Sequence, residues 1–183
     1  MSGPSGIVLC GGASTRMGRD KATLGDPPWA HRVARALQAG GCGSVEFQGG
    51  EAALGTALWP HHPDSHPGGG PVPALLESIA RHRDGAVVVA ACDLPALDGG
   101  HVSALLAGTA PDGARAYSIG GRVNWSLVSI GSDLRARLAE TGPESALGQA
   151  LGRLLGECTE PMEPQRIEAV TDIDGISDLP GPE

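Results

Sequence analysis

The sequence has 183 residues, of which 40% are hydrophobic and only 3% aromatic, and its formal net charge is -8. At this length we expect one domain over residues 1–183, with a core built mainly from Val, Leu, Ile and Ala. The acidic balance argues against a protein that binds nucleic acid or membrane surfaces, and no window is long and apolar enough to span a membrane.

The start of the chain favours a cytoplasmic location. The first twelve residues lack a charged region, and their apolar run is too short for a signal peptide. The four cysteines are far apart and form no CxxC pair, so we interpret them as reduced and mostly buried, not as zinc ligands: Cys10, Cys42, Cys92 and Cys158.

The first half of the chain alternates short apolar runs with amphipathic segments. In chain order it predicts a strand at 7–10, a long loop at 11–25, a helix at 28–39, a strand at 44–48, an irregular segment at 58–70, a helix at 73–82, a strand at 86–91 and a helix at 100–107. The run AVVVAA at 86–91 is apolar on both faces, which is typical of a parallel strand covered by helices.

The second half changes pattern. It predicts two strands at 114–119 and 123–130 around a Gly-Gly turn, helices at 133–140 and 144–155, and a last strand at 166–173. Together the halves predict an α/β sandwich with a mostly parallel sheet and one antiparallel strand in a hairpin insertion.

The loop after the first strand carries residue types that suit a phosphate site. It contains Gly11, Gly12, Ser14, Arg16 and Lys21, but its spacing is neither that of a Walker A motif nor GxGxxG. Glycines let backbone N–H groups approach an anion, Ser14 adds a hydroxyl, Arg16 offers a planar fork and Lys21 a point charge. We expect Lys21 to be exposed at the end of this loop. The alternative is a solvated basic turn.

Asp93 follows the apolar strand at 86–91. Ligands of open α/β sheets lie beyond the carboxyl ends of the strands, so Asp93 should face the loop after the first strand if the two strands are parallel neighbours. A carboxylate there suits Mg²⁺, whose remaining ligands would be phosphates and water. The alternative is a turn residue, although Asp98 is the better cap for the following helix. We interpret the six histidines as surface or loop residues: His31, His61, His62, His66, His82 and His101.

Three stretches resemble the motifs of the MobA-like nucleotidyltransferases. LCGGASTRMGRDKATL is similar to their L-x-G-G-x-S-x-R-M-G-x-D-K motif, VVVAACDLPAL to their second motif, and VTDIDGISDL to their C-terminal motif. The resemblance covers about residues 6–179 and implies a Rossmann-like three-layer sandwich.

The resemblance also implies roles for individual residues. Those that would contact nucleotide, metal or second substrate fall into four groups: Leu9, Gly11, Gly12 and Ser14 in the first loop, with Arg16 and Lys21 on the triphosphate; Asp64 near guanine and ribose; Asp93 on Mg²⁺; and Asp172 and Asp174 near the second substrate or metal. Arg16, Lys21 and Asp93 would form the catalytic set. For Asp172 and Asp174, surface caps remain an alternative.

The best-known activity in this family is the transfer of GMP from GTP to the phosphate of molybdopterin, with release of pyrophosphate. The resemblance therefore implies GTP and molybdopterin as substrates, Mg²⁺ as cofactor, and transient contacts with molybdoenzymes or other cofactor-biosynthesis proteins. Two alternatives stay open: nucleotidyl transfer with CTP or to another small phosphate, and a non-catalytic nucleotide-binding paralogue. The acceptor is the least defined part, because Asn124, Trp125 and Ser126 stand where a His-Pro step is expected.

Overall fold

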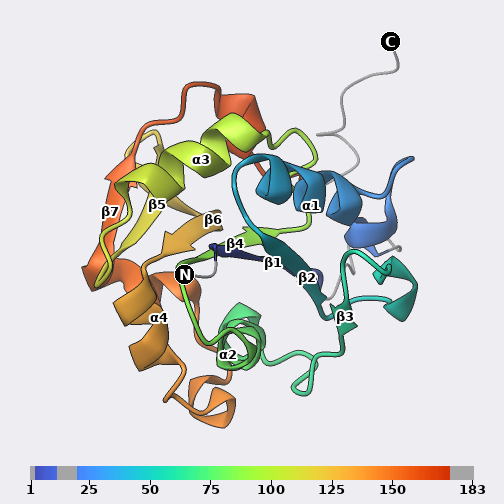
Figure 1. The fold of residues 1–183 in the computed structure, drawn as a ribbon, viewed down its shortest axis with the longest axis horizontal. Helices are drawn as coiled ribbons and strands as arrows, with labels where there is room; N and C mark the ends of the chain where they lie inside the picture. Colours follow the sequence, from blue (N-terminus) through green and yellow to red (C-terminus); the bar gives the residue numbers. More distant parts are fainter. Residues whose placement is uncertain (1–2, 12–19, 174–183) are drawn as a thin grey trace.

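The computed structural model describes residues 3–11 and 20–173, and its centre is one seven-stranded sheet in the order β3-β2-β1-β4-β6-β5-β7 (Figure 1). The strands are β1 (Ser5–Leu9), β2 (Ser44–Gln48), β3 (His61–His62), β4 (Val87–Ala91), β5 (Ala114–Ile119), β6 (Arg122–Ile130) and β7 (Thr159–Met162). None of the helices in the described ranges is long and apolar enough to cross a membrane.

Six of these strands run in one direction, and β6 runs against them. β1 pairs in parallel with β2 and β4, and β5 pairs in parallel with β7, whereas β6 is antiparallel to both β4 and β5. The predicted mostly parallel sheet with one antiparallel strand in a hairpin is therefore confirmed.

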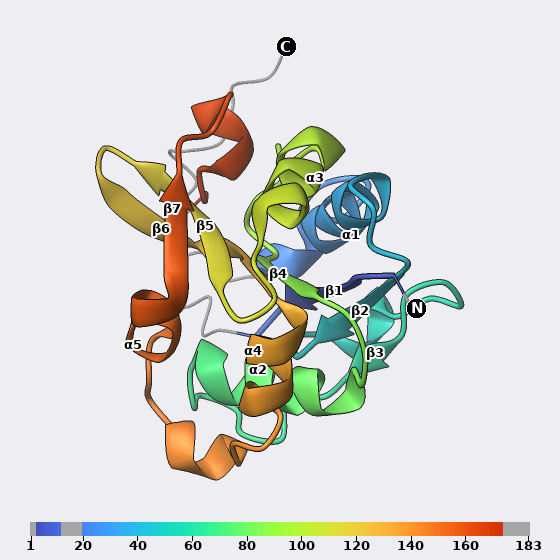
Figure 2. The same ribbon diagram turned by 60° about the vertical axis from the view of Figure 1, so that its left-hand side comes forward.

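Helices cover both faces of the sheet, which gives the predicted three layers (Figures 1 and 2). On one face lie α1 (Trp29–Ala39) and α3 (Gly99–Gly108), which contact each other; on the other lie α2 (Pro71–Arg81), α4 (Ser132–Leu138) and the short α5 (Leu151–Leu155). Asp98 caps α3 as predicted, since its side chain accepts a hydrogen bond from the backbone N–H of His101.

The strands divide their apolar side chains between two core layers. Along β1, Val8 faces α1, while Ile7 and Leu9 face α2. Along β4, Val88 and Val89 alternate in the same way. Because side chains alternate across a strand, such continuous apolar runs are needed where helices cover both faces of the sheet.

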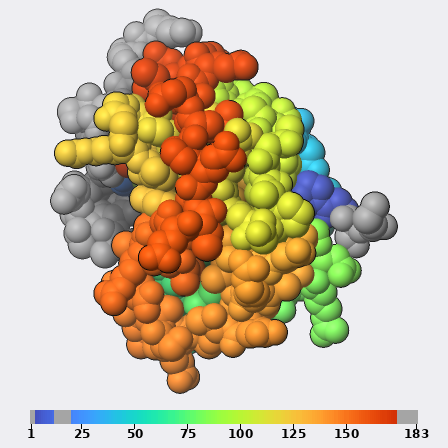
Figure 3. Space-filling view, turned by 90° about the vertical axis from the view of Figure 1, so that its left-hand side faces the viewer, coloured from blue at the N-terminus to red at the C-terminus, as the bar shows by residue number. Residues whose placement is uncertain are grey.

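The strand predicted at 166–173 is wrong. The last strand is β7, which forms an edge of the sheet, and 167–170 form a 3-10 helix, η5, whose Ala169 and Val170 are buried in the core. Figure 3 shows the β7 segment on the surface, between the yellow β5–β6 hairpin and α3. A proline has no backbone N–H, so it is tolerated in an edge strand, where one side of the strand has no partner. Pro161 also weakens the strand pattern of this segment in the sequence.

The helix predicted at 144–155 is broken in the middle. A 3-10 turn at Pro143–Ala146 and α5 are separated by a bend at Gly148, whose φ is +72°. The backbone N–H of Gly148 donates to the carbonyl of Gly69 at 2.7 Å, so the bend lies against the segment that precedes α2.

The histidines are also less uniform than predicted. His101 lies in α3 with 5% of its surface exposed, against Tyr117 and beside Asp98. It is a buried residue of the helix layer, and the interpretation as a surface residue is wrong. The cysteines follow their prediction more closely, since all four are free and only Cys158 is exposed.

Candidate active site

The carboxyl ends of β1 and β4 lie side by side, so the two loops that follow them meet. Leu9 is in register with Ala91, and the backbone N–H of Cys92 donates to the carbonyl of Leu9 at 3.1 Å. Gly11 and Asp93 therefore come from neighbouring positions beyond the carboxyl ends of these strands, as expected if the two strands are parallel neighbours.

Lys21 reaches Asp93 from the other side of this edge. It begins the 3-10 helix η1 (Lys21–Thr23), which is capped by the Asp20 side chain and contacts α1. Its ammonium lies 3.5 Å from Asp93 Oδ2 and donates to the backbone carbonyl of Ile173 at 2.8 Å. Its side chain is 16% exposed, so the expectation of an exposed loop lysine is wrong. Lys21 is also the only lysine of the sequence.

The chain returns to this point at its other end. The backbone N–H of Ile173 donates to the carbonyl of Asp93 at 3.0 Å, and the neighbouring Asp172 is close enough for its charge to act on Asp93. Three segments far apart in sequence thus meet around one carboxylate.

The Asp93 carboxyl is set up for a positive partner. Its burial raises its pKa, the Lys21 ammonium lowers it, and the Asp172 carboxylate raises it again, with a net pKa above the usual value. Within 3–11 and 20–173, its buried Oδ1 has no hydrogen-bond partner. A buried carboxylate oxygen without a donor is costly, and a cation would remove that cost.

These residues fit a hard divalent cation whose shell is completed by ligands from outside the protein. Among the described residues, no three His, Cys, Asp or Glu side chains gather to hold a metal ion by themselves. Mg²⁺ is commonly bound by one or two carboxylates with substrate phosphates and water, which matches Asp93 with Asp172 nearby.

A cavity of about 440 Å³ opens on the α2 side of the sheet at the ends of β1 and β4, and Ala91, two residues before Asp93, is among the residues that line it. Its lining residues come from the ends of β1 and β4, the start of α2, β6, and the Gly148 bend: Leu9, Gly11, Val89, Ala91, Gly70, Pro71, Trp125, Ser126, Gly148, Gln149, Ala150 and Leu151. None of these described lining residues carries a charge. The cavity therefore suits an uncharged ring that can take hydrogen bonds from Ser126, Gln149 or the backbone.

Asp64 lies beside Gly11. A Cβ placed on Gly11 would be 3.5 Å from Asp64 Oδ2, and Asp64 Oδ1 accepts from the backbone N–H of His66 at 2.8 Å. The structure thus brings together Leu9, Gly11, Lys21, Asp64, Asp93 and Asp172. The predicted site residues Gly12, Ser14, Arg16 and Asp174 lie outside the described residues.

Sequence reasoning missed Gln149 and treated Trp125 and Ser126 only as departures from a pattern. All three line the cavity. The Gly-Gln-Ala step at 148–150 was available as a turn signal, but it was absorbed into a predicted helix. Nothing in the sequence indicates that this turn lies against the Gly69–Gly70 segment.

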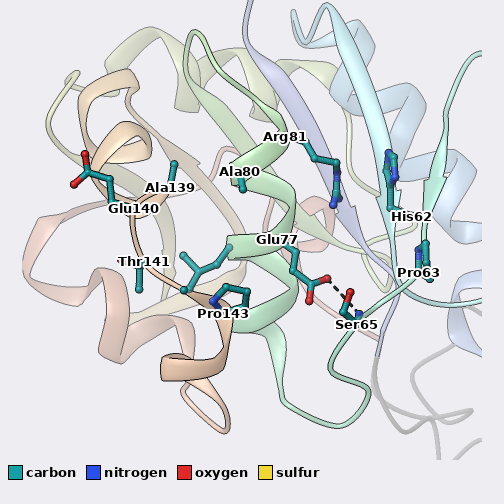
Figure 4. A pocket seen from close by; sticks show the side chains of 12 residues that line it. His62, Pro63, Ser65, Glu77, Ala80, Arg81, Ala139, Glu140, Thr141 and Pro143 are labelled. Carbon is teal, nitrogen blue, oxygen red and sulfur yellow. Dashed lines mark hydrogen bonds between the residues drawn. The ribbon is translucent and has the colours of Figure 1, made fainter.

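The loop that carries Asp64 is fastened to α2 by Glu77. Glu77 Oε1 lies 2.7 Å from His66 Nδ1, and Glu77 Oε2 accepts from the Gln48 amide at 3.0 Å and from the backbone N–H of Ser65 at 3.3 Å. Figure 4 shows the Glu77 side chain turned toward Ser65 in a second hollow, which crosses the outer face of α2 and shares no lining residue with the first. Both Glu77 oxygens are thus engaged in holding the loop that carries Asp64 to α2.

On β2, beneath the end of α2, Glu46 is buried among basic side chains. Its oxygens lie 2.7 Å from Arg81 Nη2, 3.3 Å from His82 Nε2 and 3.5 Å from His62 Nε2. Burial alone would raise its pKa, but the hydrogen bonds and charges of His82 and Arg81 outweigh burial and lower the pKa of Glu46 to about 2.

The lowered pKa of Glu46 makes the free energy of unfolding depend on pH in the acid range. In the unfolded chain Glu46 takes up a proton near its ordinary pKa of 4.5, whereas in the folded protein it does so only near about 2. Its contribution to the free energy of unfolding is therefore complete above about pH 5 and is lost as the pH falls toward 2, on the order of a few kcal/mol. Urea unfolding at several pH values should show a shallower acid dependence for Glu46→Gln than for wild type. Glu51→Gln, the same change on an exposed glutamate, should leave the slope unchanged; equal slopes for wild type and Glu46→Gln would contradict this account.

The comparisons with known proteins agree with this geometry. Residues 6–159 match the family model of the MobA-like NTP transferase domain. The chain belongs to the MobA-like NTP transferase family. It is thus a member of a family of nucleotidyltransferases, and the resemblance noted in the sequence is confirmed.

Solved structures show the same fold at low identity. A nucleotidyl transferase from Methanothermobacter thermautotrophicus is 18% identical with a TM-score of 0.77, over 97% of this chain and 94% of that one. The molybdopterin-guanine dinucleotide biosynthesis protein A from Archaeoglobus fulgidus is 17% identical with a TM-score of 0.69, over 95% and 94%. Rv0371c from Mycobacterium tuberculosis H37Rv, in complex with manganese, is 12% identical with a TM-score of 0.63, over 89% of each chain. No curated protein matches the chain.

Proposed function

We propose that this MobA-like NTP transferase moves GMP from GTP to the phosphate of molybdopterin and releases pyrophosphate. The observation that carries the proposal is the buried Asp93 carboxylate between the ends of β1 and β4, paired with Lys21 on one oxygen and, within the described residues, without a partner on the other. The neighbour from Archaeoglobus fulgidus, described as a molybdopterin-guanine dinucleotide biosynthesis protein, supports the choice of acceptor.

The reaction needs charge stabilisation and positioning more than a protein nucleophile. A phosphate oxygen of the acceptor forms a bond to the α-phosphorus of GTP. The bond from that phosphorus to the bridging oxygen breaks, and pyrophosphate leaves with the electron pair. Lys21 and Arg16 would hold the triphosphate, and Leu9, Gly11 and Asp64 would hold base and ribose. Mg²⁺ at Asp93 would neutralise charge on the transferring phosphate.

The uncharged cavity favours a flat acceptor over a sugar phosphate. On the β6 side of the cavity, the Trp125 indole offers surface to a ring system, and Ser126 and Gln149 offer hydrogen bonds, whereas Leu9 and Gly11 on the β1 side would hold the base. A pterin has these properties. A cytoplasmic location and transient contacts with molybdoenzymes are part of the same proposal.

The transfer itself is testable in one tube. The protein is incubated with Mg²⁺, each of the four ribonucleoside triphosphates in turn and molybdopterin, and the products are identified by mass spectrometry. A guanine dinucleotide with stoichiometric pyrophosphate is expected. A cytidine dinucleotide would show that the protein uses CTP, and a product formed only with another phosphorylated acceptor would show that the acceptor is not molybdopterin. Either result would contradict the proposed function.

Base selectivity gives a simpler measurement. We expect GTP to bind at least about tenfold more tightly than CTP or ATP, because a site built to hydrogen-bond one base edge leaves its polar groups unpaired with another. Isothermal titration calorimetry with each nucleotide and Mg²⁺ measures this directly. Equal affinities, or a preference for CTP, would contradict the assignment of guanine.

A further inference from the structure

Strand β6 has an irregularity where it passes the cavity. β5 and β6 pair regularly up to Ala116 with Val128, but the next residue of β5, Tyr117, pairs with Asn124. Trp125, Ser126 and Leu127 are therefore extra residues on β6, and the first two of them line the cavity. Bulges of this kind re-aim side chains and are common next to active sites.

The side chain of Asn124, the only asparagine of the sequence, holds this bulge in two directions. Its Oδ1 accepts from the backbone N–H of Ser126 at 2.8 Å, inside the bulge. Its Nδ2 donates to the backbone carbonyl of Val170, in the segment that continues to Asp172 and Ile173. One amide thus joins the cavity wall to the segment that lies against Asp93 and Lys21.

The bulge also requires that α5 leave space for the Trp125 ring. A Cβ on Gly152 would lie 2.9 Å from the indole Nε1 of Trp125, so the ring packs directly against the backbone of that helix. Trp125 is therefore packed against α5, and the next residue of its strand, Ser126, is held by the hydrogen bond from its backbone N–H to Asn124 Oδ1.

We propose that Asn124 is a positioning residue whose two hydrogen bonds align the acceptor wall, formed by Trp125 and Ser126, with the carboxylates of Asp93 and Asp172. The inference rests on the proposed function for the identity of the two ligands that are aligned. Asn124 touches neither of them. It acts through Trp125 and Ser126 on one side and through Asp172 and Ile173 on the other.

The two hydrogen bonds can be separated by substitution. In Asn124→Asp the carboxylate still accepts from Ser126 N–H, but it has no N–H to donate to the Val170 carbonyl. This variant should release the 167–173 segment and leave the acceptor wall in place. Trp125→Ala should do the reverse, because it removes the wall and keeps both hydrogen bonds of Asn124.

Metal affinity reports on the 167–173 segment, and the acceptor KM reports on the acceptor wall. For Asn124→Asp we expect Mn²⁺ binding in the presence of GTP, measured by electron paramagnetic resonance of the free ion, to weaken at least about tenfold, as for other residues that act behind metal ligands. The kcat should fall by at least about tenfold and the acceptor KM should stay within about twofold. For Trp125→Ala we expect the acceptor KM to rise at least about tenfold, with Mn²⁺ affinity within about twofold.

A third readout does not depend on any substrate. Hydrogen exchange of peptides covering 167–173, followed by mass spectrometry, should speed up at least about tenfold in Asn124→Asp, because the Ile173 amide loses its protected position against Asp93. Gln165→Glu is the matched control, since it makes the same amide-to-carboxylate change on an exposed side chain near this segment. It should behave as wild type in all three measurements.

The outcomes separate the inference from the proposed function. If no acceptor is modified by wild type, the proposed function fails, while Mn²⁺ binding and hydrogen exchange still decide the role of Asn124. If Asn124→Asp only lowers the melting temperature, with Mn²⁺ affinity and exchange at 167–173 unchanged, the residue is merely structural and the inference is overturned. Should Asn124→Asp not fold, Asn124→Ala removes both hydrogen bonds without adding charge and should impair Mn²⁺ affinity and acceptor KM together.

Discussion

Asp93→Asn should lower the turnover number for nucleotidyl transfer by at least about a hundredfold while the protein keeps its fold. The amide has nearly the shape of the carboxylate but no charge, so it can neither bind a divalent cation well nor pair with Lys21. Steady-state rates at saturating GTP and Mg²⁺ measure the loss, and circular dichroism checks the fold.

The stability of this variant distinguishes a functional carboxylate from a structural one. Because burial raises the pKa of Asp93, its ionised form is disfavoured in the folded protein, and it lowers stability at neutral pH when no cation is bound. We therefore expect the melting temperature of Asp93→Asn without metal to equal or slightly exceed that of wild type, and added Mg²⁺ to raise the melting temperature of wild type alone. Asp84→Asn, at an exposed aspartate, is the control. A Mg²⁺-dependent Asp93→Asn enzyme with normal turnover would place the metal elsewhere.

Lys21→Ala should reduce the single-turnover rate about a hundredfold and weaken GTP binding by less than about tenfold. The ammonium is held by Asp93 and Ile173, and in the proposed transfer it would respond to charge that moves from the α-phosphate toward pyrophosphate. Lys21→Arg should rescue only part of the rate, because a planar fork cannot occupy the same point. A rate equal to wild type would remove Lys21 from the site.

Burial of Lys21 adds a consequence for stability. Lys21→Ala leaves the Asp93 carboxylate buried without its cation, and we expect a loss on the order of 1 to 3 kcal/mol in the free energy of unfolding. The double variant with Asp93→Asn should recover most of that loss, and the four proteins form a double-mutant cycle. Since Lys21 is the only lysine, protection of its amine by GTP from an amine-reactive reagent, read in the Lys21 peptide, reports contact with nucleotide independently of turnover.

Much of the fold and the centre of the site could be predicted from local patterns. β1 and β4 are short apolar runs, and Asp93 and Gly11 follow them directly, so their meeting required only that the strands be parallel neighbours. β7 could not be found in this way, because four residues that include Pro161 and two polar side chains carry little strand pattern. The apolar residues of η5 led to the prediction of a strand, although they form a short 3-10 helix.

The hydrogen bonds that join distant segments within the site could not be predicted, for a different reason. The contacts of Lys21 with Ile173 and of Asn124 with Val170 are set by how loops close over a finished sheet, and no periodicity records them. The sequence marked Asn124, Trp125 and Ser126 as unusual. Only the structure shows that they form a bulge with one residue holding it to the far end of the chain.

The contact between Lys21 and Ile173 joins residues 152 positions apart, which has a consequence for synthesis. A nascent chain emerges from the ribosome with its N-terminal part first, so β1, β4 and the helices between them can begin to fold while 167–173 are still to be translated. Until that segment arrives, Lys21 and Asp93 lack the backbone that closes over them. The surroundings of Lys21 and Asp93 are thus completed last among the described residues, and under the proposed function a half-made chain would have no assembled site with which to consume nucleotide.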